Sequence, residues 1–347
     1  MNKLAKTLSL MALTALGANT AHATETLNVV GIFSSQKNYQ VVEEEFFKTL
    51  PEQSGLDLTV NYTPVDQLGV KARDLLRLVG SGAFDVMIVG VPIVAGDHPL
   101  LEGLDIAGIA PTGDKVEAMI ADFKPVVDDL LQAQFNTKVG ALWHFAPMQL
   151  FCKEPINTKE ELAGKKVRTF TRSQALLMSE LGMVTVDLNF AEVYTALQRG
   201  VVDCAVTDST GANGSKIVEV AHYQMNTGVS QMVAGYFINL DKWNSFSEDD
   251  RVVLQAQFDR LEAIMRDRSK ELATDASNCN IGVQPCKLHD LASLTRVEPT
   301  PEFLDAVREA AQKSSLPTWA KECNAKMPEC TAVWNKLVGA RYGLTAE

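Results

Sequence analysis

Histidine is scarce in this sequence, and the common nucleophile motifs are absent. The chain has 5 histidines in 347 residues, and none stands in a recognisable catalytic pattern. There is no GxSxG segment, which would place a serine on a sharp turn beside a base. Serine or cysteine catalysis needs such a positioned base. We therefore expect no catalytic residue and keep a periplasmic enzyme only as an alternative.

Motifs for nucleotides, metals and nucleic acids are also missing. The glycine-containing stretch 211–214 lacks both the GxGxxG pattern and the lysine of a phosphate-binding loop, so we expect no cofactor. CxxC spacing is absent, which leaves a zinc site as a minor alternative to disulfides and predicts no metal. The formal net charge is −11, whereas phosphate binding requires a basic face. The sequence thus disfavours nucleic acid as a partner.

The only long apolar run lies near the N-terminus. Lys3 and Lys6 precede an apolar stretch over 8–16, and Ala21-His22-Ala23 follows as a small-x-small cleavage pattern. The stretch is shorter than the roughly 20 residues that span a bilayer. We expect residues 1–23 to be a cleaved signal peptide and the remainder to be exported as a soluble protein, with a monomer as the default state.

The six cysteines all follow this segment, and four of them form two close sets. Cys279 lies near Cys286, and Cys323 lies near Cys330. Six intervening residues close a small loop comfortably, and an oxidising compartment preserves such bonds. We predict both disulfides. Cys152 and Cys204 either pair with each other or stay as buried thiols.

Short apolar runs alternate with helical patterns along most of the chain. Strand-like runs over 27–31, 56–62, 85–89, 166–169, 184–188 and 204–207 are separated by amphipathic segments, which is typical of a mostly parallel sheet covered by helices. Ser247 followed by Asp250 resembles a helix cap. A helix from there to about residue 277 would be about 45 Å long. That length suffices to contact two domains.

Two segments carry the most specific signal. Residues 161–168 read ELAGKKVR, and residues 190–203 read FAEVYTALQRGVVD. Both resemble the signature of DctP-type solute-binding proteins of TRAP transporters, in the same order and nearly complete. The likeness is weaker but continuous on both sides of these segments.

The resemblance implies an α/β fold: a two-domain periplasmic binding protein, type II-like, with a ligand cleft between the domains and a long helix bridging both. Domain I would hold 24–144 plus 233–272, and domain II 145–232 plus 273–347. The implied ligand is a small organic acid, and the implied partners are the TRAP transporter membrane subunits. A ligand-sensing periplasmic subunit is an alternative that the same fold allows.

The resemblance also places the ligand-binding arginine at Arg168. A guanidinium matches a carboxylate through two parallel hydrogen bonds and keeps its charge. The alternative for Arg168 is an interdomain or surface salt bridge. Many relatives have an asparagine just beyond the GVVD segment, where this chain has Thr207 and Asp208. Relatives that bind sialic acid carry another arginine near the position of Pro147, so we do not expect sialic acid.

Five further residues are candidate ligand contacts. The candidates from domain II and its border are Trp143, Gln149 and Phe170, which would supply an aromatic wall and a polar group. From domain I, Ser34 and Gln36 follow the first strand, where open α/β sheets bind ligands. The aromatic residues could equally serve the core, and the two polar residues could cap the first helix.

Overall fold

The computed structural model describes residues 24–109 and 114–347. The predicted signal peptide, 1–23, lies outside the described residues. Within the described ranges, no helix combines the length and apolarity needed to cross a membrane.

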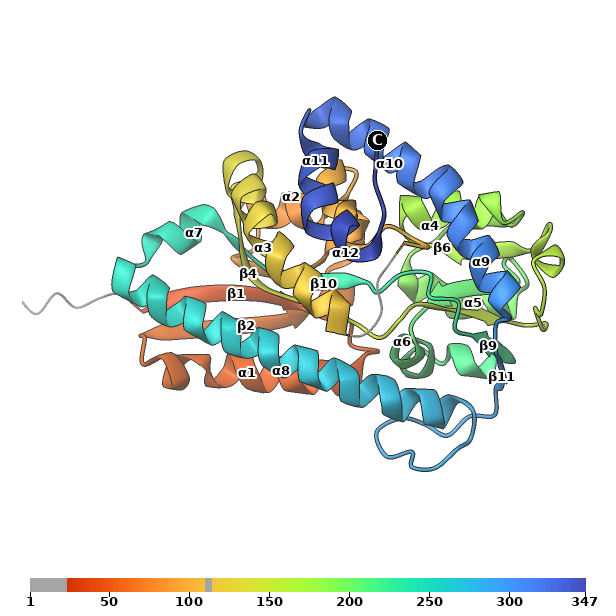
Figure 1. Cartoon of the computed structure of the whole chain (residues 1–347). Helices are drawn as coiled ribbons and strands as arrows, with labels where there is room; N and C mark the ends of the chain where they lie inside the picture. The colour runs from red at the N-terminus through yellow and green to blue at the C-terminus, as the bar shows by residue number, and fades with distance from the viewer. Residues whose placement is uncertain (1–23, 110–113) are drawn as a thin grey trace, which may run out of the picture.

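Two separate β-sheets form the framework of the molecule (Figure 1). The first sheet, sheet A, has the order β2-β1-β3-β10-β4, with bounds Leu58–Pro64, Glu25–Gly31, Val86–Gly90, Val233–Asn239 and Thr137–His144. β1 pairs in parallel with β2 and β3, whereas β10 is antiparallel to both β3 and β4. Every residue of β10 is buried, as expected for a strand covered on both faces.

The second sheet, sheet B, has the order β11-β9-β5-β8-β6-β7, with bounds Thr295–Val297, Tyr223–Met225, Gln149–Cys152, Cys204–Thr207, Lys166–Thr169 and Val184–Asp187. β6 is parallel to β7 and β8, while β5 is antiparallel to β8 and β9. The prediction of a mostly parallel sheet is therefore too simple. β5 and β10 are the strands that run antiparallel to their neighbours, and each follows a direct passage of the chain from one sheet to the other, without a crossover helix.

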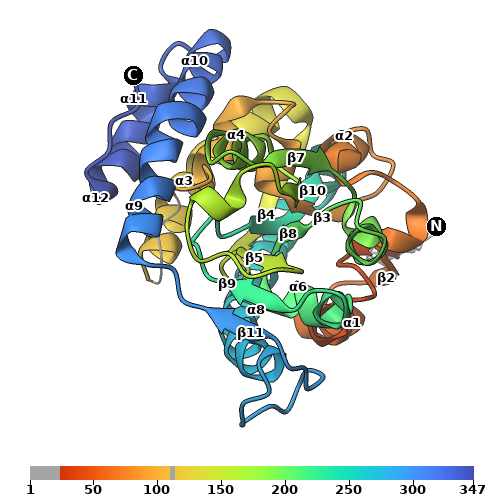
Figure 2. The same ribbon diagram turned by 90° about the vertical axis from the view of Figure 1, so that its right-hand side faces the viewer.

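Helices cover the faces of both sheets (Figures 1 and 2). Their bounds are α1 Lys37–Ser54, α2 Leu75–Gly80, α3 Asp114–Phe135, α4 Arg172–Glu180, α5 Val193–Gln198, α6 Ser209–Gly214, α7 Leu240–Ser245, α8 Glu248–Asn280, α9 Pro301–Ala310, α10 Leu316–Lys326, α11 Cys330–Trp334 and α12 Ala340–Tyr342.

The long helix α8 contacts both parts of the molecule, as predicted. The Ser247 hydroxyl accepts a hydrogen bond from the backbone N–H of Asp250 and caps its first turn. Along its length, α8 packs against α1 and β4 of the first part and against α6 of the second. Phe258 and Met265 are buried on its inner face. The two-domain α/β fold with a bridging helix is thus confirmed.

Two chain segments that pass between the sheets run side by side. The backbone N–H of Phe145 donates to Met232 O at 3.1 Å, and that of Met148 donates to Ser230 O at 2.8 Å. The buried carboxylate of Asp105 accepts from the backbone N–H groups of Gln231 and Met232, at 2.7 and 2.8 Å. Met232 has a φ of 51°, a left-handed conformation that is costly for a residue with a side chain. We conclude that Asp105 holds this interdomain crossing in place.

The C-terminal helices contact both parts of the molecule. α9 packs on α4, beside sheet B, and α10 packs on the short 3-10 segment Pro99–Leu104 beside sheet A. Two indole N–H groups anchor them: Trp319 donates to Pro99 O at 2.7 Å, and Trp334 donates to Gly103 O at 2.8 Å. We propose that domain I holds 24–144 plus 233–272 and that domain II holds 145–232 plus 273–347. The C-terminal helices then connect the two domains, as α8 also does.

Three disulfides join the cysteines. Cys279–Cys286 and Cys323–Cys330 are bonded, as the spacing predicts. Cys152 is bonded to Cys204, which is one of the two possibilities left open by the sequence. These two residues lie opposite each other on the antiparallel strands β5 and β8, so the bond links neighbouring strands of sheet B.

Candidate functional site

A cavity of about 350 Å³ lies between the two domains. This volume is within the usual range for small-molecule sites, roughly 300–1,000 Å³. The residues that line it are Ile32, Phe33, Gln36, Val65, Asp66, Gly69, Val70, Ala72, Arg73, Leu75, Ile88, Gly90, Ile93, Phe145, Met148, Arg168, Phe170, Asp187, Leu188, Asn189, Phe190, Ala191, Glu192, Thr207, Asp208, Met232 and Ala234.

Arg168, on β6, contributes a buried cation to this cavity. Its guanidinium is fixed by two backbone carbonyls: Nε donates to Leu188 O at 3.1 Å, and Nη1 donates to Val206 O at 2.9 Å. The ring centres of Phe170 and Phe190 lie 4.7 and 5.7 Å from its Cζ, within cation–π distance. These contacts hold the group in one orientation and leave part of the guanidinium available to a ligand.

Arg168 makes no ion pair with any carboxylate of the described residues. Only 3% of it is exposed, and burial lowers its pKa to about 9, while the nearby Asp187 carboxylate acts to raise the pKa. The group therefore stays charged at neutral pH. A buried charge without an ionic partner costs free energy, which an anion entering the cavity would reduce.

Thr207 and Asp208 lie beside this cation, at the end of β8. Thr207 directly follows Val206, whose carbonyl oxygen accepts from Arg168. The Asp208 carboxylate caps α6 by accepting from the backbone N–H of Gly211 at 2.7 Å, and burial raises its pKa to about 6. Because Asp208 already has this role, we regard Thr207 as the better placed of the two to assist an anion.

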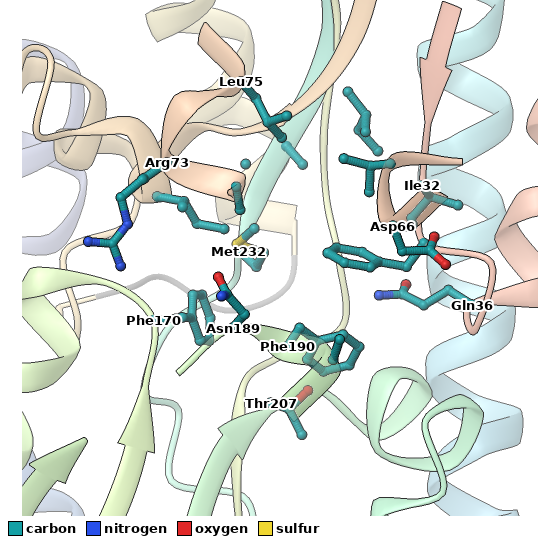
Figure 3. A pocket seen from close by; sticks show the side chains of 18 of the residues that line it. Ile32, Gln36, Asp66, Arg73, Leu75, Phe170, Asn189, Phe190, Thr207 and Met232 are labelled. Atoms are coloured by element: carbon teal, nitrogen blue, oxygen red, sulfur yellow. The ribbon is translucent and has the colours of Figure 1, made fainter. Parts of the chain in front are cut away.

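The rest of the cavity wall is mainly apolar. From domain I it is formed by side chains on β3 and on the segments that follow β1 and β2, among them Ile88, Ile32 and Val70. Phe190 lies 5.6 Å from Phe33, ring centre to ring centre, so aromatic side chains of both domains contact across the cleft. Figure 3 shows the cavity with Met232 and Asn189 near its centre and Phe190 and Thr207 on the lower side.

An ion pair connects the two domains at one end of the cavity. Arg73 Nη2 lies 2.6 Å from Asp187 Oδ2, and both side chains are more than half exposed. Arg73 precedes α2, while Asp187 ends β7. The pair therefore joins the edges of the cleft.

The structure brings five of the eight predicted contacts into the cavity lining: Gln36, Arg168, Phe170, Thr207 and Asp208. The other three lie elsewhere. Trp143 is buried in the core between Phe145 and Tyr236. Gln149 lies opposite Thr207 on β5, outside the cavity lining. The Ser34 backbone N–H and hydroxyl both donate to Asp66, at 2.8 and 2.6 Å.

Several lining residues were not predicted. Phe190 opens the second sequence motif, and its spacing from Val193 and Leu197 is that of one helix face, which is typical of core residues. Arg73 and Asp187 lie 114 residues apart in the sequence, so no local pattern reveals their pairing. Met232 also lines the cavity, and its backbone is left-handed, which the sequence does not signal.

One group of metal-binding residue types also occurs in the described chain: Asp275, Cys279 and His289. The Cys279 sulfur is bonded to Cys286 and is not a thiolate. Asp275 accepts hydrogen bonds from the backbone N–H groups of Lys287 and Leu288, and it contacts His289 Nδ1 at 2.9 Å. The arrangement stabilises the disulfide loop.

Two sheets joined by several chain crossings, with a cavity between them and a buried cation facing it, define a two-domain α/β solute-binding protein. The family model of DctP, bacterial extracellular solute-binding protein family 7, matches residues 32–321, and the chain belongs to this family. The resemblance seen in the two sequence motifs is thereby confirmed.

Individual relatives are distant. The sialic acid-binding periplasmic protein SiaP of Vibrio cholerae is 24% identical over 272 residues, which cover 76% of this chain and 79% of SiaP. The uncharacterized protein YiiZ of Salmonella typhimurium is 26% identical over 211 residues, and this chain spans 63% of its length and 58% of its own.

Solved structures share the fold. A TRAP periplasmic solute-binding protein from Desulfovibrio salexigens with bound orotic acid superposes with a TM-score of 0.80 at 18% identity, covering 91% of this chain and 99% of the other. A Bordetella pertussis extracytoplasmic solute receptor that binds pyroglutamic acid gives 0.77 at 15% identity, with 89% and 99% covered.

Proposed function

We propose that the protein is the periplasmic solute receptor of a TRAP transporter and captures a small organic monocarboxylate with an apolar body. The ligand carboxylate would bind Arg168, assisted by Thr207. Closure of the two domains would bury it, and the closed receptor would deliver it, as a monomer, to the membrane subunits. The predicted signal peptide and the three disulfides support a periplasmic location.

The observation that carries this proposal is the buried, unpaired guanidinium of Arg168. The fixed Nε and Nη1 contacts orient the group before any ligand arrives, so little conformational entropy is lost on binding. Because the other lining arginine, Arg73, is paired with Asp187, Arg168 favours a ligand with one carboxylate over a ligand with two.

The composition of the wall favours an apolar ligand body. The domain I face presents mainly aliphatic side chains, which cannot satisfy the hydroxyl groups of a sugar acid. The orotic and pyroglutamic acids bound by the two structural relatives are small ring carboxylates, consistent with this size class. The resemblance implies an arginine near the position of Pro147 in receptors for sialic acid, and this chain has none there, so the ligand named for SiaP is not proposed here.

The test is a panel of organic acids, with the neutral amide of each acid, applied to protein purified from the periplasm and freed of ligand. Thermal unfolding finds the binders, because a ligand at about 100 times its Kd adds about 2.7 kcal/mol of stability. Calorimetry then compares the wild type with Arg168→Met. The matched control is Arg172→Met, because Arg172 is exposed, pairs with Glu322 and lies outside the cavity lining.

Loss of one partner of a buried ion pair costs about 3–5 kcal/mol, and each 1.4 kcal/mol is a factor of ten in affinity. We therefore expect Arg168→Met to weaken binding at least about 100-fold, and Arg172→Met to bind like the wild type. Equal affinity of acid and amide, or tight binding by Arg168→Met, would contradict the proposed role.

A further inference from the structure

The domain I side of the cavity offers few polar groups. Among its lining residues these are Gln36, Asp66 and Arg73. Asp66 already accepts two hydrogen bonds from Ser34, and Arg73 is paired with Asp187. Gln36 is thus the polar side chain of this face that is left for a ligand.

The amide of Gln36 lacks a partner at its oxygen. Oε1 is buried and has no hydrogen-bond partner among the described residues. The backbone of Gln36 is nevertheless fixed, because its carbonyl oxygen accepts from the N–H groups of Tyr39 and Gln40 in the first turn of α1. Figure 3 shows the side chain of Gln36 reaching toward the interior of the cavity, with the amide nitrogen nearest Phe190 and the oxygen on the side of Asp66. The side chain is therefore held at the cavity with its hydrogen-bonding capacity unused.

A buried acceptor without a partner is costly, and a group on the ligand can supply the missing bond. The ligand carboxylate cannot do so, because an ionised carboxylate only accepts hydrogen bonds and Oε1 also only accepts. A hydroxyl group fits best, since it can donate to Oε1 and also accept from Nε2. It satisfies the amide in either of its two flipped orientations.

We propose that Gln36 recognises a hydroxyl group at the end of the ligand opposite its carboxylate, so that the ligand class is a hydroxylated aromatic monocarboxylate. The inference rests on the proposed function, because it takes the carboxylate to be bound by Arg168 in domain II. The aromatic ring lies among Phe33, Phe170 and Phe190.

This arrangement divides recognition between the domains. Any monocarboxylate of suitable size can bind Arg168 in the open form. In the closed form, only a ligand with a hydrogen-bond donor near Gln36 gives Oε1 of this residue a partner. The hydroxyl group therefore favours closure over binding to the open cleft, since a ligand shifts a conformational equilibrium only by its differential affinity for the two states.

The experiment compares 3-phenylpropanoate with its 2-, 3- and 4-hydroxyphenyl derivatives by calorimetry. Proteins are the wild type, Gln36→Met, which keeps the side-chain length without the amide, and Gln53→Met on the exposed end of the same helix as control. We expect at least one hydroxyl derivative to bind the wild type about 10-fold or more tighter than the parent acid. Gln53→Met keeps this ratio, while Gln36→Met reduces it to about 3-fold or less. Small-angle scattering should show closure by the preferred derivative and weaker closure by the parent.

The inference is overturned if none of the four acids binds, if no derivative exceeds the parent, or if Gln36→Met keeps the wild-type ratio. Failure of the proposed function looks different. If the proposed function is wrong, no acid of the wider panel loses affinity when Arg168 is replaced by Met. If 3-phenylpropanoate binds through Arg168 and the hydroxyl group adds nothing, the receptor function stands and the role of Gln36 falls.

Discussion

Asp105 provides a direct test of how the interdomain crossing is held. The replacement Asp105→Ala removes both acceptors of the Gln231 and Met232 N–H groups. Both donors lie in a buried region, and 2% of Asp105 is exposed, so water does not readily take its place. The crossing would lose the contacts that balance the left-handed backbone of Met232.

The size of the effect follows from the two lost hydrogen bonds. Each buried N–H left unpaired costs about 1–3 kcal/mol, which gives about 2–6 kcal/mol of unfolding free energy for Asp105→Ala. Part of this is offset because the buried carboxylate is itself unfavourable, as its pKa near 7 indicates. Asp105→Asn retains one acceptor and should lose about 1–3 kcal/mol.

Urea unfolding at neutral pH measures both values, with Asp129→Ala as the control because Asp129 lies exposed on α3. Ligand affinity should fall in parallel, since Met232 lines the cavity. Ordinary surface substitutions change the free energy of unfolding by less than about 0.5 kcal/mol. A change as small as this for Asp105→Ala would refute the conclusion that Asp105 holds the interdomain crossing in place.

Two further predictions concern charge. Because Arg73 and Asp187 are both exposed, their pair contributes about 0–1 kcal/mol, so Arg73→Met or Asp187→Asn should weaken carboxylate binding less than about 5-fold, and this loss should vanish near 1 M salt. Calorimetry at low and high salt checks it, and a loss as large as that of Arg168→Met would contradict the reasoning. Burial raises the pKa of Glu43 from 4.5 to about 7, so the protonated form is favoured in the folded state. Its stabilising contribution is complete below pH 4.5 and is lost as pH rises through about 7. Glu43→Gln should flatten this part of a stability–pH curve measured by urea unfolding, and an unchanged slope would count against it.

Local patterns were sufficient to predict most of the framework. The strands around 27–31, 85–89 and 204–207 are short apolar runs, and each forms a buried strand close to the predicted limits. The cap at Ser247 and the helical spacing that follows gave the long bridging helix. The motif placed Arg168 in the ligand cleft, and Arg168 does line the cavity, whereas its role in binding stays a prediction.

Long-range contacts were not predictable in the same way. Trp143 was predicted to line the cavity because it precedes the crossing to domain II. Its side chain instead lies on the face of β4 that packs in the core. The antiparallel entry of β5 places Cys152 opposite Cys204, and no spacing rule connects two cysteines 52 positions apart. The two backbone N–H groups that donate to Asp105 follow it in the sequence by 126 and 127 positions. Such pairings are consequences of topology rather than of local sequence.

The position of the C-terminal helices restricts how the two domains can move. Trp319 and Trp334 attach these helices to the Pro99–Leu104 segment, and α9 attaches them to α4. In Figure 2 they lie along one side of the molecule, while β7 and α2 lie on the other. Because the C-terminal helices hold the two domains together on the first side, we expect the domains to separate on the opposite side, where Arg73 pairs with Asp187. Solute would therefore enter and leave by a single route.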